Sequence, residues 1–145
     1  MYPYRYWVTL RIWHPTRDLA AATKALRIKP RRLWMAGQSR QTPKGTPLPG
    51  VNRESYWYSD LTARRGISSR QNHVEIFLAK TIKRFASARA FISRIRATGG
   101  HAELLVSLFG KRNYAVILDP ELLASAARLG FRVSIDVYPQ DQGGL

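Results

Sequence analysis

The chain has 145 residues, the usual size of one domain that buries a core without disulfides or a structural metal. Lys and Arg number 24 against 9 Asp and Glu, so the formal net charge is +15. Such a charge attracts polyanions, including nucleic acid, but does not determine the fold. The chain has no cysteine, which excludes disulfides and thiol catalysis.

Targeting and membrane signals are not found in the sequence. No apolar run approaches the length of a membrane span, and the first residues lack the apolar stretch of a signal peptide. We therefore expect a cytoplasmic protein. Of the basic residues, 18 are Arg and 6 are Lys. The guanidinium group of Arg suits phosphate and carboxylate recognition. A GC-rich genome also favours Arg codons over Lys codons, so the excess of Arg has either a functional or a compositional origin.

Alternating side chains predict a half-buried strand over residues 4–13. Its core side holds Tyr4, Tyr6, Val8, Leu10 and Ile12, and its open side holds Arg5, Trp7, Thr9, Arg11 and Trp13. Pro15 ends the strand. Thr16 is placed to cap a helix that Pro30 stops.

The middle of the chain is predicted as a short strand over residues 31–36, a long loop and a strand over residues 53–61. The loop, residues 37–50, holds three prolines and three glycines. Asn72 and Glu75 form a plausible capping pair for a helical stretch that the two glycines at residues 99–100 end. Ser87 allows either one kinked helix or two.

Two strands, residues 102–109 and 114–118, are predicted to form a hairpin through residues 110–113. A helix follows, with Asp119 as its cap, proline at its first position and Gly130 after its last. A last alternating strand covers residues 131–138 and ends at a proline.

The predicted order is β-α-β-β-α-β-β-α-β in one α+β domain, residues 1–139, with a flexible tail over residues 140–145. We expect a mainly antiparallel sheet with helices on one face, a ferredoxin-like or related sandwich. The helices that open near Thr16, Asn72 and Asp119 should cover that face. The side chains predicted to be buried beneath them are Val8, Leu10, Leu104, Val106, Val116, Val133 and Ile135.

Known catalytic motifs are absent from the sequence. The three histidines are far apart and share no ligand spacing, and there is no phosphate loop, nucleophile elbow or metal motif. We assign no catalytic residue, metal or cofactor. Four strand carboxylates have no helix-end role and are expected to pair with arginines rather than act as acids or bases: Glu54, Asp60, Glu103 and Asp136.

The open side of the first strand alternates arginine with tryptophan, and Arg53, Ser55 and Trp57 are predicted to extend it. Cations and aromatic rings on an open sheet are what a base-stacking platform requires. Alternatively, these rings pack under the long loop or in a homodimer interface, which is the commoner use of such patches. Because an open face with Trp7 and Trp13 needs to be covered, we expect a homodimer. Trp34 and Trp57 near the ends of the loop, with Arg40, Lys44 and Arg53 close to them in the sequence, could also wall a small anion site. The candidate binding residues are Arg5, Trp7, Arg11, Trp13, Trp34, Lys44, Arg53 and Trp57.

Several short motifs recur in a recognisable order along nearly the whole chain. They are Arg11-Ile12-Trp13-His14-Pro15, Leu26-x-Ile28-x-Pro30, Trp34-x-x-Gly37, Thr42-Pro43-Lys44-Gly45, Glu54-Ser55-Tyr56-Trp57, Gly99-Gly100 and Asp136-Val137-Tyr138-Pro139. Their order and spacing resemble the bacterial family of domains of unknown function numbered forty-two seventy-nine. The resemblance implies a small α+β domain with no established activity, cofactor or catalytic residue. It also implies that the +15 charge belongs to this chain rather than to the family.

The sequence leaves three functional interpretations, which we give from the most to the least favoured. The first is a non-enzymatic binding or interaction module of unknown partner. The second is a sequence-tolerant nucleic-acid binder that uses the basic, aromatic sheet face. The third is an enzyme that acts on a small anionic substrate.

Overall fold

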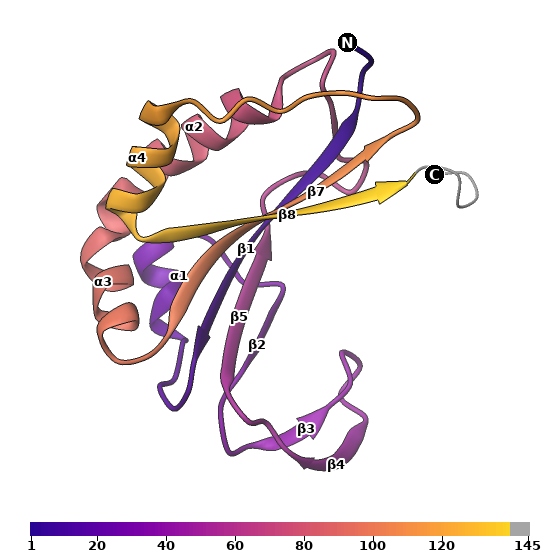
Figure 1. The fold of residues 1–145 in the computed structure, drawn as a ribbon. Coiled ribbons are helices and arrows are strands. Elements are labelled where there is room, and N and C mark those ends of the chain that lie inside the picture. The colour runs from indigo at the N-terminus through magenta and orange to yellow at the C-terminus, as the bar shows by residue number, and fades with distance from the viewer. Residues whose placement is uncertain (140–145) are drawn as a thin grey trace.

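A twisted, mixed sheet carries the helices on one of its faces in the computed structural model, which describes residues 1–139 (Figure 1). The elements in chain order are β1 (Arg5–His14), α1 (Ala21–Leu26), β2 (Arg32–Trp34), β3 (Ser39–Gln41), β4 (Pro47–Val51), β5 (Ser55–Asp60), β6 (Ile67–Ser68), α2 (Val74–Arg84), the 3₁₀ turn η1 (Ala86–Ala88), α3 (Arg89–Ala97), β7 (His101–Gly110), α4 (Pro120–Leu129) and β8 (Phe131–Pro139). The α+β prediction with helices on one face is confirmed. The predicted tail, residues 140–145, lies outside the described residues.

The strand order of the main sheet is β2-β5-β1-β7-β8, and the short β6 pairs with the start of β1. Every pairing is antiparallel except that of β7 with β8, which is parallel. The predicted mainly antiparallel sheet is therefore correct. β1 occupies the middle, which agrees with its strict alternation of buried and partly exposed side chains.

The core lies between the sheet and the helices. Four of the predicted core residues are fully buried: Val8, Leu10, Leu104 and Val106. Val116 and Val133 are partly buried and pack against this cluster. The prediction for Ile135 is wrong, because its side chain is 44% exposed. The end of β8 extends beyond the helices, so nothing from the helical layer covers it (Figure 1).

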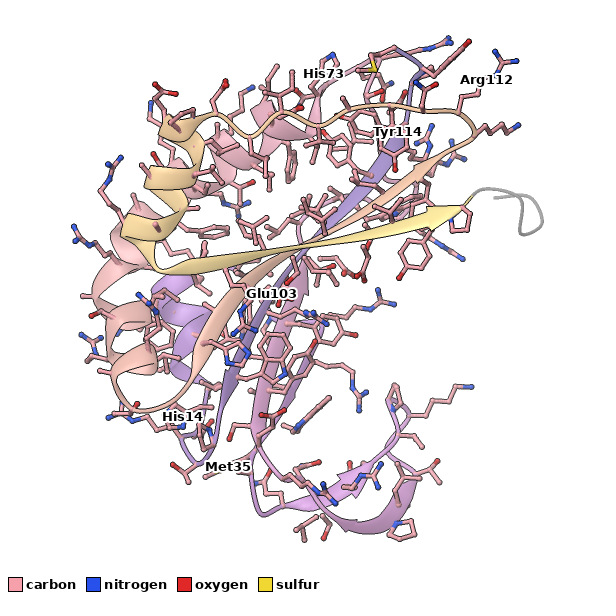
Figure 2. All side chains as sticks on the ribbon, viewed as in Figure 1. His14, Met35, His73, Glu103, Arg112 and Tyr114 are labelled. Atoms are coloured by element: carbon pink, nitrogen blue, oxygen red, sulfur yellow. The ribbon has the colours of Figure 1, made fainter. Side chains whose placement is uncertain are left out.

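The predicted hairpin of residues 102–109 with residues 114–118 is wrong. The neighbour of β7 is the parallel strand β8, and residues 114–118 run as an extended segment along the helical layer (Figure 1). Tyr114 from this segment stacks on Tyr4, with 4.9 Å between ring centroids, and Figure 2 shows Tyr114 near the start of β1. Its alternating apolar residues do face the core, but against side chains rather than as a strand of the sheet.

Residues 37–50, predicted as a loop, form a two-stranded hairpin of β3 and β4 that we call the arm. The arm projects on the side of the sheet away from the helices (Figure 1). Hydrogen bonds tie its base together: the Gly37 amide donates to the carbonyl of Asn52 at 2.8 Å, and the Asn52 side chain donates to the carbonyl of Met35 at 3.1 Å. Met35 marks the foot of the arm in Figure 2.

Helix ends follow the sequence signals only in part. The last helix begins at Pro120 after Asp119 and ends before a left-handed Gly130, as predicted. α1 begins at Ala21, not near Thr16, whose amide instead donates to His14. Helices α2 and α3 are separate, joined by η1. Glu75 does not cap α2, because its Oε1 accepts the amide hydrogen of Ile117 at 2.7 Å.

Candidate binding face on the open side of the sheet

Four aromatic side chains lie side by side across the open face, one on each of four adjacent strands. We call them the aromatic row: His101 on β7, Trp13 on β1, Tyr56 on β5 and Trp34 on β2. Their ring centroids are 4.6 Å apart for the first pair, 5.2 Å for the second and 4.6 Å for the third. These separations lie in the range in which aromatic rings attract one another. The strand register thus builds a continuous aromatic stripe perpendicular to the strands.

Guanidinium groups lie over the two tryptophan rings of the row. The Cζ atom of Arg11 is 4.7 Å from the ring centroid of Trp13, and that of Arg32 is 4.8 Å from the ring centroid of Trp34. Both arginines sit two residues along the strand from the ring that they cover, on the same face. Each cation is attracted by the electron-rich face of its ring.

Glu103 is a buried carboxylate on the open face, only 3% exposed, near the middle of the sheet (Figure 2). Its Oε1 accepts hydrogen bonds from Nη2 and Nε of Arg11, the latter at 2.9 Å, and its Oε2 accepts the hydroxyl of Ser134 at 2.7 Å. Burial opposes the charge of Arg11, but the hydrogen bond and charge of Glu103 outweigh it and raise the pKa of the guanidinium. Arg31 likewise pairs with Asp60 at 2.6 Å. The predicted pairing with arginine is confirmed for these two carboxylates.

The aromatic row is uncharged near neutral pH. Burial, helped by the charge of Arg132, lowers the pKa of His101 below its ordinary value. Burial also raises the pKa of Tyr56, partly offset by Arg11. The row is therefore a neutral, largely apolar stripe, and the positive charge of this face lies beside it.

Trp34 stands where the sheet meets the arm and lines two hollows. One hollow, of about 550 Å³, also takes in Arg32 and residues of β3. The other, of about 660 Å³, is lined by Arg40, Arg53, Glu54 and β4. Both volumes are in the range of small-ligand sites. Lys44 is exposed in the turn at the tip of the arm.

Trp7 occupies the other end of the open face, under the loop that follows β5. Its indole N–H donates to the carbonyl of Arg64 at 3.0 Å, and its ring packs edge-on against Phe109. Arg5 donates to the carbonyl of Arg65 at 2.8 Å. The structure thus gives Trp7 and Arg5 contacts within the chain and separates them from the aromatic row.

The prediction that Ser55 and Trp57 extend the open face is wrong. Trp57 pairs with Ile12 on the core face, is fully buried and donates its indole N–H to Thr23 at 3.1 Å. In the run Ser-Tyr-Trp-Tyr-Ser both faces carry aromatic rings, so the pattern alone does not decide which face is buried. Ser55 and Ser59 are buried on the same face, and their small side chains leave room for Trp57 under α1.

Because the faces of β5 were assigned the wrong way round, Tyr56 and Tyr58 were not predicted to lie on the open face, where the structure places them. Arg32 and His101 were also missed as members of this face, whereas Arg40 was expected beside Trp34 and does line a hollow with it. For Arg32 a signal existed, since it precedes Trp34 by two residues in a predicted strand. His101 has no such signal, because only the register of β7 against β1 brings it to Trp13.

The fold and this face define a small α+β domain whose open sheet surface is aromatic and basic. The model of the family described as a domain of unknown function, DUF4279, matches residues 3–140, and the chain belongs to that family. No curated protein and no solved structure matches it. None of the helices within residues 1–139 is long and apolar enough to cross a membrane.

Proposed function

We propose that this chain is a binding module that holds single-stranded nucleic acid on the open face of its sheet. The observation that carries the proposal is the aromatic row of four rings on adjacent strands, with guanidinium groups over both of its tryptophans. Aromatic rings on an open sheet stack bases without regard to sequence, and nearby cations meet the phosphates.

Unneutralised arginines beside the row support an anionic ligand. Among residues 1–139 the ion pairs are Arg11 with Glu103 and Arg31 with Asp60. Arg32, Arg40 and Arg53 therefore have no carboxylate partner within the part of the chain that the structure describes. All three line the two hollows that share Trp34, where, among residues 1–139, Glu54 is the one carboxylate against these three arginines. A strand that stacks on this ring would place phosphates within their reach.

Glu103 favours binding over catalysis. Among the carboxylates of residues 1–139 Glu103 is the least exposed as a residue, and both of its oxygens accept hydrogen bonds from this chain. Its bonds fix Arg11 over the aromatic row and attach β8 to β7. A carboxylate held in this way acts as a positioning group, and a free acid or base would instead face the solvent or a ligand.

Binding of labelled oligo-dT and oligo-U, measured by fluorescence anisotropy, tests the proposal. We expect Trp34→Ala to weaken binding by roughly five-fold or more with the salt dependence unchanged, because stacking contributes about 1–3 kcal/mol per base. Trp34→Phe should keep most of the affinity. Arg53→Gln should instead reduce the slope of log affinity against log salt by roughly one unit.

Arg94→Gln is the matched control, since Arg94 is exposed on α3 in the helical layer. It removes the same charge far from the aromatic row. Any protein of this charge attracts polyanions, so the comparison between positions is what matters. The proposal is refuted if Trp34→Ala binds like the parent, or if Arg94→Gln lowers the slope as much as Arg53→Gln.

A further inference from the structure

A groove of about 820 Å³ runs between α2 and α4, in the helical layer. Its apolar lining includes Ile76 of α2, Ile117 of the segment before α4, and Leu122 of α4. Ile117 is 66% exposed and Ile76 is 49% exposed. Small side chains, among them Ala79 and Ser125, leave the groove hollow. Large apolar side chains gathered in a concave place gain free energy when a partner covers them.

The two ends of the groove carry opposite charge. Lys80 and Lys83 of α2, Arg89 of α3 and Arg128 of α4 line it. None of these four belongs to the ion pairs found among residues 1–139. The carboxylates of the lining sit where the two helices begin, at Glu75, Asp119 and Glu121. The cationic half therefore has no carboxylate to meet it within the described chain.

We propose that this groove docks an amphipathic helix of a protein partner, with an apolar stripe flanked by acidic residues. The apolar stripe would cover Ile76, Ile117 and Leu122, and the acidic flank would meet Lys80 and Lys83. Two neighbouring helices present ridges and a furrow that accept a third helix, and small residues in the furrow allow close approach. The site is independent of the nucleic-acid face, because it is built from helices on the other side of the sheet.

The probe is a designed helical peptide of about 18 residues, with leucines at three- and four-residue spacing and glutamates beside them. A scrambled peptide of the same composition has the same charge but no apolar stripe. We expect the designed peptide to bind at least about ten-fold more tightly than the scrambled one, as measured by isothermal titration calorimetry. In NMR spectra its largest shifts should fall on the amides of Ala79 and Ser125.

Two variants of the groove carry the decisive comparison. Lys80→Glu with Lys83→Glu should weaken binding of the designed peptide by about ten-fold or more, because the reversed charges would repel its acidic flank. Lys24→Glu with Lys29→Glu makes the same change of net charge on exposed lysines near α1, and should cost only about two-fold. Both lysine pairs are exposed, so folding is preserved in each variant.

A second pair tests the apolar stripe. Ile76→Asp should abolish the preference for the designed over the scrambled peptide. Val51→Asp, which changes an exposed apolar residue at the end of β4, should leave that preference intact. Equal binding of the two peptides, or equal effects of the two lysine pairs, overturns the proposal. So does saturable binding of dodecanoate without binding of the peptide, which would make the groove a site for anionic amphiphiles. Displacement of the peptide by oligo-dT would also contradict it.

Discussion

The Nε2 atom of His14 lies 2.8 Å from Oγ1 of Thr98 and joins the end of β1 to the end of α3. Its Nδ1 accepts the amide hydrogens of Thr16, at 3.0 Å, and Arg17, at 2.7 Å. Two donors on Nδ1 require that the ring proton of the neutral imidazole sits on Nε2, which donates to Thr98. His14 is only 2% exposed, and this tautomer anchors the turn after β1.

We expect the stability of the protein to fall as the pH drops below about 6.5, the ordinary pKa of histidine. Burial, together with the charge of Arg17, lowers the pKa of His14 in the folded state. The unfolded chain then binds more protons, so the stabilisation is complete above the unfolded pKa and is lost as the pH falls toward the folded one. Urea unfolding at several pH values, with NMR titration of the ring, measures this.

His14→Asn should remove part of that pH dependence and cost about 1–2 kcal/mol, because an Asn oxygen can still accept the turn amides but cannot reach Thr98. His101, whose pKa burial also lowers, contributes to the pH dependence that remains. His73→Asn is the control, since His73 is exposed at the start of α2. An unchanged pH profile in His14→Asn would contradict the assignment.

Gly66→Ala should destabilise the protein by about 2–4 kcal/mol, from backbone strain and overpacking together. Gly66 has φ +67°, and a Cβ there would lie 2.7 Å from both the Trp7 ring and the carbonyl oxygen of Tyr6. Gly45→Ala provides the comparison, because Gly45 has φ +86° with nothing within 4 Å of the added carbon. It should cost only about 1–2 kcal/mol. Equal losses in thermal unfolding would show that the loop yields freely around Trp7.

Arg11→Met should cost about 2–4 kcal/mol, because it leaves the Glu103 carboxylate buried with Ser134 as its remaining donor. The Arg11 side chain is 28% accessible, so solvent screening keeps this cost below that of breaking a fully buried ion pair. Adding Glu103→Gln to Arg11→Met should recover most of the loss, since the uncompensated charge is gone. If the double variant is as unstable as the single one, the cost comes from lost packing of the arginine over Trp13.

Self-association, expected from the sequence, remains a prediction and now has a different surface. Trp7 is covered by its loop, whereas the edge strand β8 exposes Ile135, Val137 and Tyr138 on an unpaired side of the main sheet. Exposed edges of this kind pair with a second copy. We expect a dimer mass by light scattering at about 50 µM, and a monomer for Val137→Lys. A monomer mass for the parent chain would exclude the dimer.

Elements with a local signal could be predicted from the sequence. β1 follows from its alternation, and α4 follows from Asp119, the proline after it and Gly130. Helices on one face follow from the one-sided alternation of the strands. Each of these signals depends on residues that are neighbours in the chain.

Features that depend on distant neighbours could not be predicted. Residues 114–118 alternate like a strand, but β8 occupies the position beside β7. The face of Trp57 is decided by its register with Ile12, which the run of residues around it does not encode. The candidate face shows the same division. Trp13 was found from the alternation of its strand and Trp34 from its place at the end of the predicted loop, whereas His101 joins them only through pairing of β1 with β7.

The arm is attached to the domain by a short set of hydrogen bonds around Asn52, and none of its residues belongs to the buried core. Changes in its length or composition therefore alter the walls of the two hollows beside Trp34 without a large penalty in folding free energy. We therefore expect the arm to tolerate substitutions that the sheet and helices do not. Replacing the arm by one of another sequence is expected to change the ligand preference that we propose for this face.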